Sequence, residues 1–344
     1  YINRGNNDNE YNNGKIINRI IELRIERTKL LGYSSYAEYA IEDRMAGSVE
    51  RVESFTKQLW DAALPVAKNE AAQLQAMINA EGKDFKLAFW DWRYYAEKVR
   101  KEKFALDENE LRQYFEINHV RDGIFMVANK LYGLKFEQRF DVPVYHPDAT
   151  VWEVQEADGT FIGLLYMDMY PRESKRSGAW MTSFRDQHVD LEGNFVTPVI
   201  SLVCNFTKPV GDTPSLLTFD EVTTFFHEFG HSLHGLLSKV KLPSQSGTSV
   251  DHDFVELPSQ VMENWARHPE VLKMYAKHYQ TGEVIPDELI EKLKAAGSFN
   301  QGFETVEFMA SALLDMEYHI LTEYTPFEVK DFEQKVKDKF NMMD

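Results

Sequence analysis

Two histidines and a glutamate within five residues form the pattern in this chain that most directly implies chemistry. Residues 225–235 read FFHEFGHSLHG and contain His227, Glu228 and His231. On a helix, residues four apart lie on one face, so both imidazoles can reach one ion and Glu228 can hold a water bound to it. This is the ligand-plus-base arrangement of a zinc peptidase. With 10 histidines in 344 residues, chance produces such a match on the order of a few per cent of the time, so the surrounding residues must decide.

A catalytic zinc site needs a third protein ligand, with the fourth position left open. His234 follows His231 by three residues, but it is about 10 Å along the helix from His227, so we expect it to pack or to support a ligand. The metzincin arrangement places a third histidine six residues after the second one, and position 237 is leucine. The best remaining candidate is Glu256, in the segment DFVELPSQVMENW.

Glu256 begins a polar stripe on a helix predicted over residues 254–267. Glu256, Gln260 and Glu263 are spaced i, i+4 and i+7 beside apolar residues, so one helix face carries three polar groups. A buried face should not carry such a stripe without partners, which favours Glu256 as the third metal ligand. Glu263 could then accept a hydrogen bond from a histidine and fix its tautomer. A solvated face with Glu256 at its outer end is the alternative.

The segment 199–206, which precedes the motif helix, bears on substrate binding because it is apolar and β-prone. If it forms an exposed sheet edge, an extended peptide could pair with it through main-chain hydrogen bonds. An ordinary buried strand fits the same residues. The segment holds the chain's one cysteine, Cys204, which we expect to be a buried, inert thiol. A single cysteine rules out a disulfide within the chain and a metal site built from cysteines.

The charge balance argues against nucleic acid as a partner. The chain has 55 acidic and 38 basic residues and a net charge of −17, and an acidic surface repels phosphate backbones. We interpret the short basic cluster Arg172, Lys175 and Arg176 as a solvated loop rather than an anion site. No apolar run approaches the roughly 18 residues of a membrane span. We expect a soluble monomer in the cytoplasm or the periplasm, with the cytoplasm favoured because cysteine is scarce.

Most of the chain has helical periodicity, and a β-rich stretch begins at about residue 135. The predicted fold is therefore mainly α with a small antiparallel β-sheet (α+β), divided into a helical region 1–134 and a region 135–344 with the sheet and the metal motif. Ser34-Ser35 and Ser48 are predicted to open helices, Asp107 is a predicted acidic cap, and Asp158-Gly159 predicts a hairpin turn. The predicted helices are 15–31, 35–45, 48–80, 88–104, 107–131, 219–237, 254–267, 269–281, 286–299 and 301–322. The predicted strands are 142–145, 151–155, 161–169 and 197–206.

Several segments together resemble a known family. HEFGHSLHG, the preceding YMDMYPRESKRSGAW and NFTKP, and the following SGTSVDHDFVELPSQVMENW are similar to the thimet oligopeptidase and peptidyl-dipeptidase family of zinc metallopeptidases. The similarity runs from YINRGNN to FNQGFETVEFMASALLDMEYH and covers essentially the whole chain. SKRSGAWM and DFVELPSQ resemble the bacterial peptidyl-dipeptidase (dipeptidyl carboxypeptidase) branch more than the endopeptidase branch.

The resemblance implies one Zn²⁺ per chain, held by His227, His231 and Glu256, with Glu228 as the general base that activates the zinc-bound water. It also implies a zincin-like core in a helical, two-lobed protein whose deep channel admits short unstructured peptides. The expected reaction is the release of C-terminal dipeptides. Cleavage of internal bonds of short peptides is the alternative.

Family members are considerably longer at both ends, whereas this chain begins with Tyr1 and ends in a helical pattern without a terminating signal. We therefore expect an internal piece of a longer protein. In the family, a later Gly- and Tyr-rich segment supplies His and Tyr residues that bind substrate and the oxyanion. An oxyanion donor is commonly worth about 10²–10³ in rate, so this piece alone is expected to be weak or inactive. For the piece alone, a non-catalytic, zinc-stabilised peptide-binding module is the alternative.

Overall fold

The chain forms two compact units. The computed structural model describes residues 5–7, 9–104 and 106–343. The first unit joins Tyr1–Ala105 to Ala295–Asp344, and the second is Leu106–Lys294. The mainly helical fold with a small sheet that the sequence predicts is confirmed. The predicted division into 1–134 and 135–344 marks the change from helices to strands, whereas the compact units divide the chain elsewhere.

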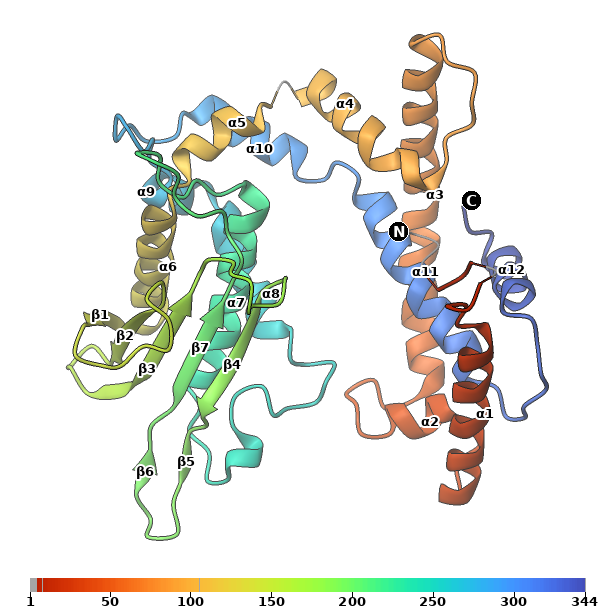
Figure 1. Ribbon diagram of the computed structural model, residues 1–344, viewed down its shortest axis with the longest axis horizontal. Coiled ribbons are helices and arrows are strands. Elements are labelled where there is room, and N and C mark those ends of the chain that lie inside the picture. Colours follow the sequence, from red (N-terminus) through yellow and green to blue (C-terminus); the bar gives the residue numbers. More distant parts are fainter. Residues whose placement is uncertain (1–4, 8, 105, 344) are drawn as a thin grey trace. The chain divides into compact units, whose positions relative to one another are not determined.

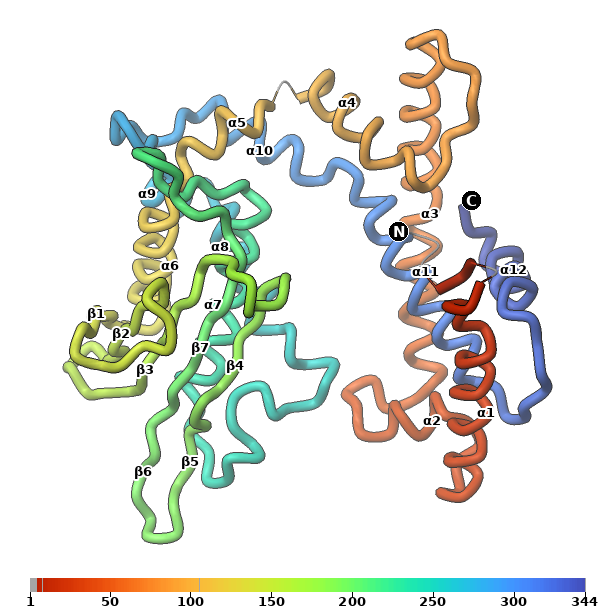
Figure 2. Tube along the Cα trace, viewed as in Figure 1, coloured from red at the N-terminus to blue at the C-terminus, as the bar shows by residue number. Residues whose placement is uncertain are grey.

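The first unit contains helices and no strand in the part that the structure describes (Figures 1 and 2). Its longest helix, α3 (Val49–Ala80), continues through Pro65 as predicted and lies beside α11 (Gln301–His319). Apolar side chains of these two helices form a buried cluster. The other elements are α1 (Gly14–Leu31), α2 (Tyr36–Ile41), η1 (Phe89–Asp91), α4 (Trp92–Phe104) and α12 (Val329–Phe340).

The start of α11 explains how closely it approaches α3. A Cβ atom at Gly302 would lie 2.6 Å from the main-chain nitrogen of Ala67, a distance that no real Cβ tolerates. The Glu70 carboxylate accepts hydrogen bonds from the main-chain N–H groups of Gly302 and Phe303, at 3.2 and 2.7 Å. These are donors that the first turn of a helix otherwise leaves unsatisfied. A glycine and a carboxylate therefore join two helices that are far apart in the sequence.

The helix starts predicted at Ser34-Ser35 and Ser48 and the cap predicted at Asp107 are confirmed, whereas the expectation of a chain end without a terminating signal is wrong. The side chains of Ser35, Ser48 and Asp107 each accept a hydrogen bond from a main-chain N–H in the first turn that follows. The final helix was expected to lack a terminating signal. Instead, α12 ends at Phe340 and is followed by Asn341 in the left-handed conformation, at φ 52°. Asparagine tolerates this conformation better than most residues, which makes it a C-terminal cap.

The second unit contains a five-stranded sheet in the order β1-β2-β3-β7-β4 (Figure 1). It is mixed, which differs from the small antiparallel sheet that the sequence predicts, because β3 and β7 pair in parallel. After β3 the chain forms β4, β5 and β6, and β7 then runs beside β3 in the same direction. The strands are β1 (Lys135–Arg139), β2 (Thr150–Gln155), β3 (Phe161–Asp168), β4 (Trp180–Arg185), β5 (His188–Val189), β6 (Phe195–Val196) and β7 (Val199–Val203).

Two predicted elements of this unit differ in the structure. Residues 142–145 form no strand, because Pro143 cannot donate a hydrogen bond to a neighbouring strand; β1 takes the place beside β2 instead. The helix predicted over 107–131 is broken before Glu116, whose carboxylate caps the helix that follows. The main chain there bridges to residues about a hundred positions away or more, contacts that no local pattern encodes. The resulting elements are α5 (Glu108–Leu111), η2 (Arg112–Tyr114) and α6 (Ile117–Tyr132).

The motif helix α7 (Phe219–Leu236) lies along one face of this sheet (Figure 1). A reciprocal pair of hydrogen bonds between Thr218 and Glu221 fixes its first turn. Farther along, Gly235 lets the helix approach β7, since a Cβ there would lie 2.6 Å from Cδ1 of Ile200. The other helices are η3 (Pro243–Gln245), α8 (Leu257–Arg267), α9 (Pro269–Tyr275) and α10 (Asp287–Ala296). Among the described helices, none has the length and apolarity needed to cross a membrane.

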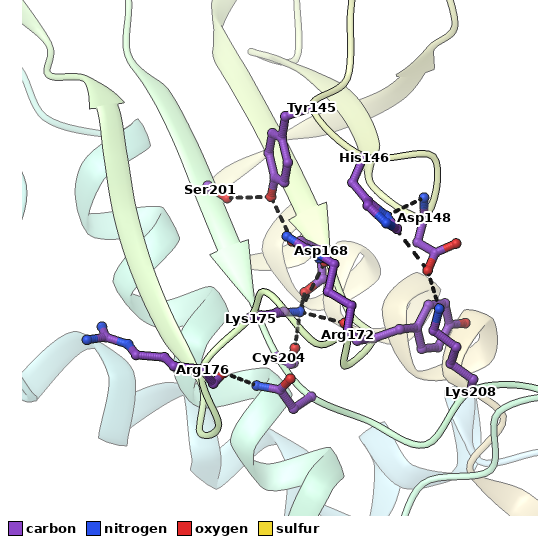
Figure 3. A network of polar contacts seen from close by, with 12 residues as sticks. Tyr145, His146, Asp148, Asp168, Arg172, Lys175, Arg176, Ser201, Cys204 and Lys208 are labelled. Atoms are coloured by element: carbon purple, nitrogen blue, oxygen red, sulfur yellow. Dashed lines mark hydrogen bonds and ion pairs between the residues drawn. The ribbon is translucent and has the colours of Figure 1, made fainter.

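The basic cluster after β3 is largely buried, so its interpretation as a solvated loop is wrong for two of its three residues. The side chains of Lys175 and Asp168 are 2% and 1% exposed, and Lys175 Nζ lies 3.0 Å from Asp168 Oδ1 (Figure 3). Arg172 donates to both Asp168 oxygens, at 2.9 and 2.8 Å. Burial raises the pKa of Asp168, but the Lys175 and Arg172 cations outweigh it and hold that pKa below its usual value. A buried carboxylate requires cationic partners, so Lys175 and Arg172 lie beside Asp168. The sequence of the cluster alone does not reveal this pairing.

Candidate metal centre

The structure brings the three predicted metal ligands together. His227 and His231 lie one turn apart on α7, with their ring centres 4.9 Å apart. Glu256 Oε2 lies 3.1 Å from Nε2 of His227 and 3.1 Å from Nε2 of His231. One ligand atom from each of the three side chains falls within 4.8 Å of the other two.

These three side chains fit a zinc ion. Ligand atoms around a tetrahedral zinc, with bonds of about 2.0–2.1 Å, lie about 3.3 Å apart. The Nε2–Oε2 separations of 3.1 Å are close to that spacing. Burial lowers the pKa of His231, which favours the neutral imidazole that a metal requires. Two imidazoles and one carboxylate are also a donor set that zinc prefers.

Glu256 reaches the histidines from the position just before α8, not from inside a helix as predicted. The helix begins at Leu257, because Pro258 lacks an N–H and therefore belongs in a first turn. The Ser259 hydroxyl donates to Glu256 Oε2 at 2.8 Å. Burial raises the pKa of Glu256, but the Ser259 hydroxyl and the two histidines outweigh it and hold that pKa below its usual value. The carboxylate is therefore held ionised, as a metal ligand must be.

Glu263 lies two turns farther along α8 and contacts the other nitrogen of His227. Its Oε1 is 2.7 Å from His227 Nδ1. A carboxylate at this distance favours the tautomer with the proton on Nδ1, which leaves the Nε2 lone pair directed at Glu256. This is the contact that the polar stripe on this helix predicts.

Glu228 is buried beside the cluster, with a residue exposure of 6%. Burial raises the pKa of this carboxyl group to about 7; His227 and the main-chain amide of Met181 lower it, and Glu256 raises it. Its Oε2 has no hydrogen-bond partner among the described residues. A carboxylate in this state has a free oxygen available for a water molecule or a substrate group. Glu228 lies next to the ligand cluster but is not among the three side chains that converge.

Two polar residues near the motif lie outside the cluster. His234 is not among the three side chains that converge, and its ring packs edge-on against Phe254 with the ring centres 6.4 Å apart. Burial lowers its pKa, so it is a packing residue, in agreement with the spacing argument. Gln260, the middle member of the predicted stripe, is exposed. The stripe therefore contributes its two glutamates to the site and not its glutamine.

Of the two alternatives for residues 199–206, the structure shows the buried strand. β7 pairs with β3 on one side and with β4 on the other, so it offers no free edge to a peptide. The outermost strand on that side of the sheet is β4, whose Met181 amide interacts with Glu228. Cys204 is fully buried, as predicted, and burial raises the pKa of its thiol.

Gly230 is a site residue that motif reasoning did not identify. A Cβ atom at this position would lie 2.6 Å from Cα of Ser259 and 2.7 Å from the carbonyl oxygen of Pro258. Both are main-chain atoms of the first turn of α8, so glycine permits the close approach of α7 and α8. This approach brings Glu256 within reach of the histidines. The only signal in the sequence is a glycine within a helical motif, which is a costly choice unless packing requires it.

Comparison with known proteins identifies the family of this chain. The family model described as Peptidase family M3 matches residues 1–344. The chain belongs to peptidase family M3. A curated relative of this M3 chain, the dipeptidyl carboxypeptidase of Escherichia coli (strain K12), is 46% identical over 329 residues, covering 95% of the chain and 48% of the relative. Oligopeptidase A of the same organism is 38% identical over 324 residues, covering 94% of the chain and 47% of the relative.

This M3 chain thus spans about half the length of the curated relatives that it matches. A solved structure, that of a candidate oligoendopeptidase F from Bacillus anthracis str. Ames, resembles its fold with a TM-score of 0.50 at 16% identity. That likeness covers 95% of this chain and 49% of the other. At such low identity it bears on the fold alone.

We predict that Gly230→Ala lowers zinc affinity because the added methyl group meets main-chain atoms of α8 and displaces Glu256. Gly235→Ala is the matched control on the same helix, since its methyl group would meet the flexible end of Ile200 instead. Zinc competition with a chelator should show weaker binding for the first variant and near wild-type binding for the second. Equal zinc affinity in both variants would rule out this role for Gly230.

We predict that Glu263→Gln weakens zinc binding by about 10- to 100-fold, the usual effect of removing a carboxylate that supports a histidine ligand. Gln260→Ala, on the exposed face of the same helix, should leave zinc affinity unchanged. Both are measured by competition with a chelator, with circular dichroism as the check on folding. An unchanged affinity in a folded Glu263→Gln variant contradicts the support role.

Proposed function

We propose that this chain carries the zinc centre of a peptidase that releases dipeptides from the free C-termini of short peptides. The observation that carries the proposal is the convergence of two imidazole nitrogens and a carboxylate oxygen beside the buried Glu228. His227, His231 and Glu256 would hold one Zn²⁺. When bound, zinc polarises a peptide carbonyl and lowers the pKa of a water molecule toward about 7.

Glu228 supplies the proton transfers in this proposal. Its carboxylate accepts a proton from the attacking water, and its protonated form then donates that proton to the nitrogen of the leaving amine. In the metal-free chain, burial raises the pKa of this carboxyl group to about 7. A bound cation would lower that pKa and favour the carboxylate that accepts the proton.

The sheet edge at β4 is the proposed place for the peptide backbone. β4 is the outermost strand on that side, and its Met181 amide interacts with the Glu228 carboxylate. A peptide that adds to this edge as an extra strand therefore lies beside the proton acceptor. Main-chain pairing requires no particular side chains, which suits an enzyme that acts on short peptides of varied sequence.

The similarity to dipeptidyl carboxypeptidase, at 46% identity, supports the removal of C-terminal dipeptides. The second candidate is cleavage of internal bonds, which the 38% identity to oligopeptidase A favours. Because the chain spans about half the length of these relatives, the activity is proposed for the full-length protein. The 344-residue chain alone is expected to bind zinc and to be weak or inactive in hydrolysis.

We predict that Glu228→Gln in the full-length protein abolishes peptide hydrolysis but keeps bound zinc, because the amide cannot accept the proton and is not a ligand. Glu256→Ala is the contrasting variant and should lose zinc. Metal analysis and a chromogenic peptide assay, with and without a chelator, measure both effects. Wild-type turnover by Glu228→Gln would exclude its role as the base, and full zinc content in Glu256→Ala would remove it from the ligand set.

We predict that the full-length protein converts a short peptide into a series of dipeptides released from the C-terminus. Amidation of that terminus should slow the reaction strongly, because the charged group that the enzyme recognises is gone. Product mapping by mass spectrometry on the free and amidated peptides tests this. Internal cleavage that is indifferent to amidation would favour the oligopeptidase function instead.

A further inference from the structure

We propose that Arg176 binds the C-terminal carboxylate of the peptide substrate. This proposal rests on the proposed function and deepens it, because the release of C-terminal dipeptides requires a group that recognises a free carboxylate. The relevant part of the structure is the loop between β3 and β4, which ends at the sheet edge next to Glu228.

Arg176 is a free cation at this edge. It is exposed, and no acidic side chain pairs with it among the described residues. Its neighbours Arg172 and Lys175 are instead paired with one shared carboxylate, that of Asp168. In Figure 3 the side chain of Arg176 extends away from that network. An unpaired guanidinium group is available for an anionic ligand. The chain has a net charge of −17, so acidic side chains that could have paired with Arg176 are abundant.

The main chain at Arg176 is held in place by hydrogen bonds. The preceding residue, Lys175, donates from Nζ to the carbonyl oxygens of Asp168, Tyr170 and Cys204, in addition to its ion pair with Asp168. Asn205 Nδ2 donates to the carbonyl oxygens of Arg176 itself and of Gly178, at 3.0 and 2.7 Å (Figure 3). These contacts fix the main chain of the loop to the ends of β3 and β7. Because the main chain is already fixed, less entropy is lost when the Arg176 side chain binds a ligand.

The guanidinium group is also oriented by an aromatic ring. Its central carbon lies 4.8 Å from the ring centre of Trp180, the first residue of β4. A cation stacked on an aromatic face keeps its N–H groups free at the edges of the guanidinium plane. Those N–H groups form a fork that matches the two oxygens of a carboxylate. The stack therefore presents a carboxylate-binding group at the beginning of the edge strand.

The proposed peptide runs antiparallel to β4, so its C-terminal end lies beside the N-terminal end of this strand. The cleaved bond is placed level with Met181, because the amide of this residue interacts with Glu228. Two residues of extended peptide span about 7 Å, which carries the terminal carboxylate past Met181 toward Trp180 and the loop before it. Arg176 reaches this region with its long side chain.

A binding experiment tests the proposal without relying on turnover. The full-length protein in a zinc-loaded Glu228→Gln background is titrated with one short peptide in two forms, with a free and with an amidated C-terminus. Calorimetry gives the dissociation constants, and Trp180 adds a fluorescence signal next to the binding group. The unmodified Arg176 protein should prefer the free acid by about 10- to 100-fold, the range for a charge-assisted pair.

Arg176→Gln should remove this preference and leave the affinity for the amidated peptide unchanged, and Arg176→Lys should restore part of it. Lys208→Gln, which removes an exposed lysine paired with Asp148, is the matched control and should keep the full preference. A preference that survives in Arg176→Gln, or that is absent when Arg176 is present, overturns the proposal. Chelator-sensitive hydrolysis is measured separately in the protein with Glu228, so failure of the proposed function is distinguishable from failure of the role of Arg176.

Discussion

The close packing of α7 against the first turn of α8 is the constraint on which the site depends. With no side chain at Gly230, main-chain atoms of Pro258 and Ser259 come to within contact distance of the motif helix. Glu256 stands directly before that turn and Glu263 lies farther along α8, so α8 and the residue that precedes it contact both nitrogens of His227. The geometry of the three ligands is thereby determined by main-chain contact, which is stiffer than contact between side chains.

Burial of the catalytic candidate is the second determinant of the site. Glu228 is buried and interacts with the Met181 amide of the edge strand, and desolvation raises its pKa to about 7. Its Oε2 has no hydrogen-bond partner among the described residues. A buried polar atom without a partner costs stability. Such a cost is commonly found where a fold prepares a place for a ligand or for chemistry. Here the Glu228 carboxyl group lies next to the three metal-binding side chains, and a cation bound there would stabilise its charged form.

Local patterns predict part of this structure, and long-range contacts determine the rest. His227, Glu228 and His231 follow from helical spacing, and the pair Glu256 and Glu263 follows from the polar stripe. The parallel pairing of β3 and β7, the break before Glu116 and the interior position of β7 depend on residues distant in the chain. The burial of Lys175 likewise depends on Asp168 and on the ends of two strands, so a basic loop in the sequence becomes a buried ion pair.

The ammonium group of Lys175 gathers three carbonyl oxygens and a carboxylate oxygen, a set of ligands that resembles the coordination of a small monovalent cation. This cation is covalently attached to the chain, so dialysis and chelators cannot remove it. The ends of β3 and β7 thus carry a permanent counter-ion to Asp168, whereas an ion held by the histidine cluster would be exchangeable. Metal depletion would therefore leave the anchoring of the loop after β3 intact and would empty only the proposed zinc site.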